Sequence, residues 1–291
     1  MAETCPGVAS SVVTQALNGG PIQRFLKFND YLDRWDLTPD GDPIITHSSQ
    51  LLPVRQGDTP AMLKIAVESE EQFGGHLMSW WAGRGAARVL GHEGAALLME
   101  RAENNLSLAE LARSGRDDEA SRIICEAIAV LHKQIDRPPF ALVPLTGWFE
   151  DLTLAAAQYG GILTACAATA YELLKTPQEV VVLHGDVHHE NILHFGSRGW
   201  LAIDPKRLIG ERGFDYANLF CNPDAEIATA AGRLARQVDV VVEAAGLERK
   251  RLLQWILAWA GLSAAWWLQD GESPTSDLIV AELAAAELAK N

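Results

Sequence analysis

Closely spaced cysteines are missing from this sequence. The chain has four cysteines, Cys5, Cys125, Cys166 and Cys221, and none forms a CxxC pair. A disulfide scaffold or a structural zinc site usually needs such pairs, so neither is expected and a reducing compartment is favoured. No basic segment precedes a long apolar run, so we expect no signal peptide. No stretch approaches the roughly eighteen apolar residues of a membrane span, which favours a cytoplasmic protein without a membrane partner.

Basic residues are also few. The chain has 24 Lys and Arg against 38 Asp and Glu, a formal net charge of -14. Nucleic acids attract clustered Lys and Arg, so no nucleic-acid partner is expected. The acidity suits a cationic small molecule, although negative charge also serves simply to keep proteins in solution. With 291 residues, 48% of them hydrophobic, the chain can form one large domain or two lobes, and we expect a monomer.

The first hundred residues show short extended runs separated by turn signals. Turns are expected at 40–43 and 57–60, with strand, turn and strand over 44–54 and a further strand over 61–67. A helix is expected from about Glu70 to Trp81. Two more strands, at 89–90 and 96–100 with a turn at 92–94 between them, complete a small antiparallel sheet.

From Ser107 onward the pattern is mainly helical. Apolar residues recur at helical spacing behind acidic residues over 117–135. The exception is a strand at 180–183 followed by a hairpin over 192–203. Further helices are expected at 225–245, 248–269 and 276–289. We therefore predict an α+β fold of two lobes, with an N-lobe of residues 1–101 and a C-lobe of residues 102–291.

The stretch HGDVHHEN, residues 184–191, is the most informative part of the sequence. Phosphoryl transfer requires an oriented acceptor, metal ions that bridge the phosphates, and positive charge on the nucleotide. Asp186 is expected to take the proton of an attacking hydroxyl. Asn191, five residues later, and Asp204, at the end of the next hairpin, are expected to bind the metal. The kinase catalytic loop has the same Asp-to-Asn spacing and the same downstream Asp.

Lys64 lies inside an apolar strand, where kinases place the lysine that contacts the nucleotide phosphates. The helix that follows should provide its Glu partner. Glu71 is our choice, with Glu70 as the alternative. The first turn of a helix is often acidic because of the helix dipole, so neither glutamate is assigned by pattern alone.

Two further segments are expected to contact the nucleotide. Ser48 and Ser49 lie where a turn should cover the phosphates, although the sequence has no GxGxxG there and a plain hairpin turn is equally compatible. Glu100 and Ala102 lie at the end of the last N-lobe strand, where backbone groups should face the adenine.

The histidines of the 184–191 stretch also permit a zinc interpretation. His184 and His188 are four residues apart, as in HExxH, but that motif works on a helix and this segment connects a strand to a hairpin. We therefore reject zinc. His184 is expected to brace the loop through hydrogen bonds to neighbouring backbone.

With these residues placed, the sequence resembles the aminoglycoside and hydroxyurea antibiotic-resistance kinases, and within them the streptomycin 6-phosphotransferases. The resemblance covers most of the chain and is sharpest at 183–193, 199–206 and 213–219. It implies a protein-kinase-like fold, ATP with Mg2+, and phosphorylation of a streptomycin hydroxyl, the 6-hydroxyl, as a means of resistance. It also implies that Asp215 lies under the catalytic loop and accepts hydrogen bonds from its backbone. The pair Gly74-Gly75 departs from a strong helix pattern.

Streptomycin has two guanidinium groups, so its site should offer carboxylates. The candidates are Asp270 and Glu272, next to Trp267, and also Asp224 and Glu226. Helix capping is the preferred role for Asp224 and an equally compatible role for Asp270 and Glu272.

Two rival interpretations stay open. The first is a kinase of another small molecule, such as hydroxyurea, another aminoglycoside or a metabolite. The second is a kinase-like protein that binds nucleotide without catalysis. The presence of Lys64, Asp186, Asn191 and Asp204 argues against this second rival.

Overall fold

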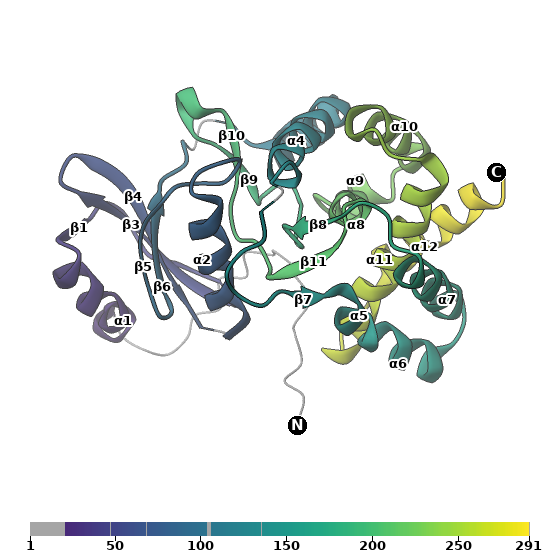
Figure 1. The fold of residues 1–291 in the computed structure, drawn as a ribbon, viewed down its shortest axis with the longest axis horizontal. Coiled ribbons are helices and arrows are strands. Elements are labelled where there is room, and N and C mark those ends of the chain that lie inside the picture. Colours follow the sequence, from purple (N-terminus) through teal and green to yellow (C-terminus); the bar gives the residue numbers. More distant parts are fainter. Residues whose placement is uncertain (1–20, 47, 68, 104–105, 135, 291) are drawn as a thin grey trace.

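A six-stranded antiparallel sheet forms one end of the molecule, and helices form most of the other end (Figure 1). The structure is a computed structural model that describes residues 21–46, 48–67, 69–103, 106–134 and 136–290, except for the side chains of 21–27 and 69–72. The predicted α+β architecture, with a strand-rich first part and a mainly helical second part, is confirmed. The lobe boundary at 101/102 stays a prediction.

Lys64 lies in β4, a central strand of the sheet, whose order is β1-β3-β4-β6-β5 with β2 paired to β3. Side chains alternate between the two faces of a strand. Ala61, Leu63 and Ile65 therefore pack on one face, in an apolar cluster with Phe28 of α1 (Pro21–Arg34), and Lys64 points to the other face. The strands are β1 Leu37–Pro39, β2 Ile44–Ile45, β3 Ser49–Gln56, β4 Thr59–Ala66, β5 Val89–Glu93 and β6 Ala96–Glu100.

Helix α2 (Ser69–Trp81) approaches the segment around Asp204 very closely. A Cβ atom at Gly74 would lie 2.6 Å from the carbonyl oxygen of Pro205, and one at Gly75 would lie 2.6 Å from Nε2 of His92. Glycine lowers helix stability, but here the absent side chains are what lets the helix and the segment meet. This close packing therefore explains why the helix contains the Gly74-Gly75 pair.

The 184–191 stretch connects β8 (Val180–Leu183) to the hairpin of β9 (Ile192–His194) and β10 (Trp200–Ala202), as predicted. β8 pairs with β11 (Leu208–Glu211), which also pairs with β7 (Val143–Pro144).

The β9–β10 hairpin is tied to the N-terminal part of the chain. The N–H of Ala87 donates to Ala202 and that of Ala202 donates to Gly85, each at 2.9 Å. At the hairpin tip, in η2 (Gly196–Arg198), Arg198 forms an ion pair with Glu100 and donates to the carbonyl of Gly83 at 2.6 Å. The hairpin that ends at Asp204 is therefore fixed against the end of β6.

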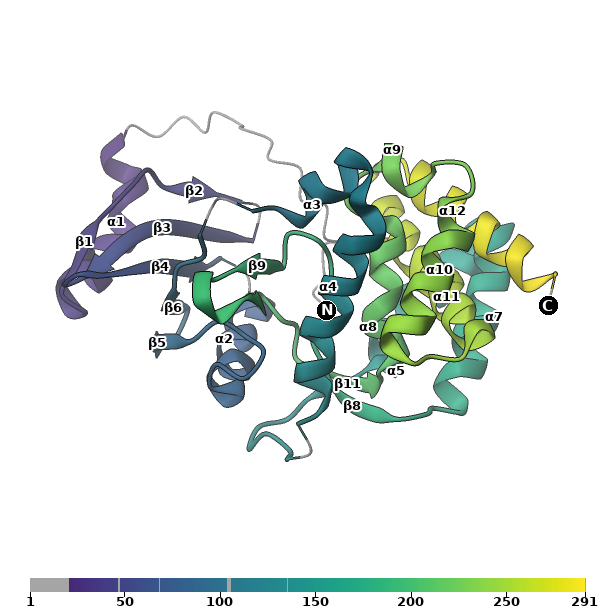
Figure 2. The same cartoon turned by 90° about the horizontal axis from the view of Figure 1, so that it is seen from above.

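The helical part is built around α11 (Arg249–Gln269), which is buried on most sides. Trp255, Trp259 and Trp266 of this helix are each at most 5% exposed. Figure 2 shows α4 between the sheet and the other helices. The remaining helical segments are α3 Leu108–Leu111, the π-turn η1 Ala112–Arg116, α4 Asp117–His132, α5 Leu145–Trp148, α6 Glu150–Tyr159, α7 Ile162–Lys175, α8 Gly213–Ala217, the 3-10 segment η3 Asn218–Cys221, α9 Ala225–Ala228, α10 Arg233–Ala245 and α12 Thr275–Leu288.

Two predicted elements need correction. The helix predicted at 225–245 is interrupted: α9 ends at Ala228 and α10 begins at Arg233, because Gly232 adopts a left-handed conformation with φ 73°. The turn predicted at 92–94 is displaced, since β5 continues through Glu93 and the positive φ of 58° falls at Gly94.

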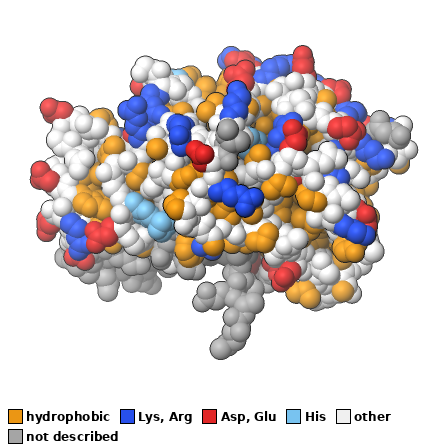
Figure 3. All heavy atoms as spheres, in the orientation of Figure 1, with side chains coloured by type: hydrophobic (Ala, Val, Ile, Leu, Met, Phe, Trp, Pro, Cys, Tyr) orange, Lys and Arg blue, Asp and Glu red, His pale blue; other side chains and the backbone are white. Residues whose placement is uncertain are grey.

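The surface gives no sign of a single charged patch on the face shown in Figure 3, where basic and acidic side chains are interspersed. The net charge of -14 therefore does not by itself locate a cation site on this face. Within the described ranges, no helix is long and apolar enough to cross a bilayer.

A buried ion pair joins α4 to α10. Arg233 donates to Asp117 (2.8 Å), and their side chains are 3% and 6% exposed. Replacement Arg233→Met leaves the carboxylate buried without its cation, so we expect the free energy of unfolding to fall by about 3–5 kcal/mol. The control Arg116→Met removes an exposed partner of Glu119 and should cost at most about 1 kcal/mol. Urea denaturation measures both, and equal losses in the two variants would contradict the assignment.

The close approach of α2 gives a second prediction. Gly74→Ala favours the helix by about 1 kcal/mol on propensity, yet its Cβ collides with the Pro205 carbonyl. We expect the helix or the Asp204 segment to shift and the affinity for ATP, the nucleotide predicted from the sequence, to fall. In the control Gly147→Ala the new Cβ meets nothing within 4 Å, so ATP affinity should not change. Isothermal titration calorimetry compares the two, and an unaltered affinity in Gly74→Ala would show that the approach is dispensable.

Candidate active site

The buried carboxylate of Asp215, on α8, fixes the loop of residues 184–191 through hydrogen bonds. Its Oδ2 accepts a hydrogen bond from the N–H of His184 (2.9 Å), and its Oδ1 accepts one from the N–H of Gly185 (2.7 Å). Nε2 of His132, on α4, lies 2.8 Å from Oδ2 and provides a third donor. The loop contacts are those that the resemblance implies. His132 is 83 residues away along the chain, and no motif in the sequence links it to Asp215.

His184 connects the loop to the segment that precedes Asp204. Its Nδ1 accepts the N–H of Asp186 (3.2 Å), so the ring proton is on Nε2, which lies 2.8 Å from the carbonyl oxygen of Ile203. Burial lowers the pKa of His184, so the ring is neutral at pH 7. Both nitrogens are therefore engaged, in the bracing arrangement that the sequence predicts. Gly185 next to it has φ 85°, a conformation that disfavours any side chain.

Asp186 is 2% exposed and oriented by two amides. Nδ2 of Asn191 lies 3.2 Å from Oδ2 of Asp186, and Nδ2 of Asn218 lies 3.2 Å from Oδ1. Asn218 is fixed in turn by Nε1 of Trp259, 3.0 Å from its amide oxygen. Sequence reasoning missed Asn218, although it lies within the 213–219 stretch that carries the resemblance. It comes from a different element, and no fixed spacing links it to Asp186.

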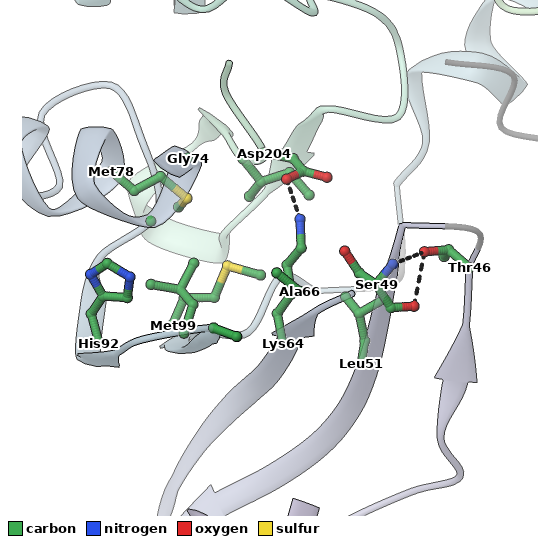
Figure 4. A pocket seen from close by; sticks show the side chains of 14 residues that line it. Thr46, Ser49, Leu51, Lys64, Ala66, Gly74, Met78, His92, Met99 and Asp204 are labelled. Carbon is green, nitrogen blue, oxygen red and sulfur yellow. Dashed lines mark hydrogen bonds and ion pairs between the residues drawn. The ribbon is translucent and has the colours of Figure 1, made fainter. Parts of the chain in front are cut away.

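Lys64 of β4 reaches Asp204 across the gap between sheet and hairpin, and the two form an ion pair (Figure 4). Lys64 is only 5% exposed. Asp204 has φ 61°, a strained conformation for a residue with a side chain, of the kind that functional sites often contain. The side chains of Glu70 and Glu71 lie outside the described part of the structure, so the partner of Lys64 stays a prediction.

Asn191 and Asp204 lie close together, because the N–H of Ile203 donates to the carbonyl of Asn191 at 2.9 Å. The amide nitrogen of Asn191 is engaged with Asp186, which leaves the amide oxygen as its ligand atom. An amide oxygen and a carboxylate suit a hard divalent cation whose remaining ligands are phosphate oxygens and waters. Among the described residues, no group of three or more His, Cys, Asp or Glu could bind a metal by itself.

A cavity lies beside the Lys64–Asp204 pair, between the sheet and α2 (Figure 4). Ser49 and Thr46 line it, whereas Ser48 is not among its lining residues. The N–H of Ser49 donates to Oγ1 of Thr46 (3.0 Å), which closes the turn without a glycine-rich loop. Of the two predicted phosphate-covering serines, the structure therefore places Ser49 at the cavity.

The two residues predicted to face the adenine, Glu100 and Ala102, have different environments. The carboxylate of Glu100 pairs with Arg198 and accepts the N–H of Arg88 (2.6 Å), so its side chain joins parts of the chain together. The N–H of Ala102 has no hydrogen-bond partner within the described ranges and remains the predicted contact for the base.

The predicted acceptor residues lie at the far end of α11. Asp270 directly follows the last residue of α11, about 16 Å along the axis from Trp259, and both it and Glu272 are exposed. Among the described residues, no hydrogen bond or ion pair joins the side chains of Asp270, Glu272 or the half-buried Trp267 to the 184–191 loop, and this site stays a prediction. Asp224 caps α9 through the N–H of Ile227 (3.0 Å), which is the role preferred for it.

Comparisons with known proteins agree with this geometry. A model of the family described as aminoglycoside/hydroxyurea antibiotic resistance kinase matches residues 34–271. The chain is 52% identical to a streptomycin 3''-kinase of Klebsiella pneumoniae, over 82% of this chain and 92% of the relative. It is 32% identical to a streptomycin 6-kinase of Streptomyces griseus, over 87% of each chain.

Solved structures show the same fold at low sequence identity. An ethanolamine kinase of Plasmodium vivax superposes with a TM-score of 0.64 at 11% identity, over 94% of this chain and 92% of that one. Kinases of this fold use a nucleoside triphosphate together with a divalent metal ion. The match over 34–271, the identity to the two kinases and the shared fold establish that the chain belongs to the aminoglycoside/hydroxyurea antibiotic resistance kinase family.

Proposed function

We propose that the protein transfers the γ-phosphoryl group of ATP, with Mg2+, to a hydroxyl of streptomycin and thereby confers resistance. The observation that supports the reaction is the Asp186 carboxylate, oriented by two amides in a loop that Asp215 fixes. The 52% identity to a streptomycin 3''-kinase supports the substrate. Streptomycin is a polycation with two guanidinium groups, which suits the net charge of -14.

The chain's own residues account for each part of the reaction. Asp186 accepts the proton of the acceptor hydroxyl while the hydroxyl oxygen attacks the γ-phosphorus and ADP departs. Lys64 leaves Asp204 and contacts the nucleotide phosphates. Asn191 and Asp204 would hold Mg2+, which would supply positive charge to offset the negative charge of the phosphate groups. Because the transition state is loose, most of the rate gain comes from positioning and charge.

The hydroxyl that is modified has two candidates. The resemblance noted in the sequence favours the 6-hydroxyl, and a 6-kinase at 32% identity is compatible with it. The identity of 52% to a 3''-kinase is much higher. We therefore propose the 3''-hydroxyl as the acceptor and keep the 6-hydroxyl as the second candidate.

Asp186→Asn tests the reaction. The amide cannot take the hydroxyl proton, so streptomycin-dependent ADP formation should fall by at least about 100-fold while ATP affinity changes little. The control Asp239→Asn alters an exposed carboxylate that pairs with Arg249 and should retain full activity. A coupled ADP assay and calorimetry give both quantities. Loss of ATP binding with retained turnover would overturn the role of Asp186.

The product tests the acceptor. Incubation of the wild-type enzyme with ATP, Mg2+ and streptomycin should give a monophosphate whose phosphorus couples to the proton at the 3'' position in NMR spectra. Coupling to the proton at position 6 would replace the 3''-hydroxyl by the second candidate. Absence of any streptomycin phosphate would reject the substrate, and a panel with hydroxyurea and other aminoglycosides would then identify the acceptor.

A further inference from the structure

The ring of His188 carries an N–H donor that has no hydrogen-bond acceptor within the described part of the loop. Its Nδ1 accepts the N–H of Glu190 (3.3 Å), so the neutral ring has its proton on Nε2. Within the described part of the chain, Nε2 is buried without a hydrogen-bond partner, and the residue is 4% exposed. Burial lowers the pKa of His188 to about 4, so the ring is neutral at pH 7. An unsatisfied buried donor costs about 1–3 kcal/mol, which a ligand atom can recover.

The ring Nε2–H of His188 lies near the carboxylate of Asp186, the proposed catalytic base. Nε2 of His188 lies 3.9 Å from Oδ2 of Asp186, the oxygen that also accepts the amide of Asn191. This separation is too long for a direct hydrogen bond. One oxygen atom placed about 2.8 Å from both Nε2 and Oδ2 would make hydrogen bonds to each at an angle of about 90°. A hydroxyl oxygen that gives its proton to Oδ2 of Asp186 can occupy such a place.

We propose that Nε2–H of His188 donates a hydrogen bond to the attacking oxygen of the acceptor, while Oδ2 of Asp186 accepts the proton of the same hydroxyl. The inference rests on the proposed phosphotransferase function. In the step, the O–H bond breaks toward Asp186, the new P–O bond forms, the bond to ADP breaks, and His188 retains its proton. The two contacts fix the direction of the remaining lone pair, which points at the phosphorus. His188 is thus a catalytic residue that touches the acceptor.

Two substitutions of His188 distinguish the effect of its N–H donor from the effect of its side-chain volume. His188→Leu keeps the volume and removes the donor, whereas His188→Gln puts an amide N–H near the place of Nε2. For the leucine variant we expect kcat/KM for streptomycin to fall by about 10- to 100-fold, with an unaltered KM for ATP. For the glutamine variant we expect recovery to within a few-fold of wild type. His189→Leu serves as the matched control, since it removes an adjacent buried imidazole whose ring nitrogens make no hydrogen bond to Asp186 or to any other residue in the described structure.

Each outcome of these assays either supports or contradicts the role proposed for His188. A leucine variant within a few-fold of wild type, a glutamine variant as poor as leucine, or an equal loss in His189→Leu would overturn the proposal. Turnover by the wild-type enzyme reports separately on the proposed function. Where the wild type fails on streptomycin, the same variants are compared in ATP hydrolysis, because an attacking water places its oxygen between the same two groups.

Discussion

The buried carboxylate of Asp215 is the constraint on which the geometry of the site depends. It accepts the N–H groups of His184 and Gly185 and a ring proton of His132, so its hydrogen bonds are made within the protein and the loop backbone has one position. His184 extends the constraint, since one ring nitrogen meets the N–H of Asp186 and the other meets the carbonyl before Asp204. The proposed base and the proposed metal ligand are therefore placed by a single buried group.

The second constraint is the contact between the sheet and the helical part. Gly74 lets α2 approach the carbonyl of Pro205, next to Asp204, and the Glu100–Arg198 ion pair fixes the tip of the same hairpin. Lys64, on β4, meets Asp204 across this boundary. The proposed phosphate-binding lysine and the proposed metal-binding residues thus come from the sheet and from the hairpin, which are joined by contacts that include no proposed catalytic residue.

The sequence predicted the parts of the site that local spacing determines. Asp186 and Asn191 lie in one loop, and Lys64 lies inside one apolar strand. All three residues could therefore be predicted without a structure. Asn218, His132 and Trp259 could not, because their contacts depend on how separate helices pack. The break between α9 and α10 escaped prediction since Gly232 is compatible with a weak helix as well as with a turn. The acceptor site expected at Asp270 and Glu272 stays a prediction, because the composition of a segment does not determine where a bound acceptor would lie relative to the loop.

The most direct measurement is a crystal structure with a non-hydrolysable ATP analogue and Mn2+, whose anomalous signal locates the cation. The account predicts that the cation is bound by a carboxylate oxygen of Asp204 and the amide oxygen of Asn191. It also predicts that Nζ of Lys64 has left Asp204 for the phosphates, while the hydrogen bonds of Asp215 to the loop are unchanged. A cation bound by other residues, or a Lys64 that remains paired with Asp204 beside a bound nucleotide, would contradict the account.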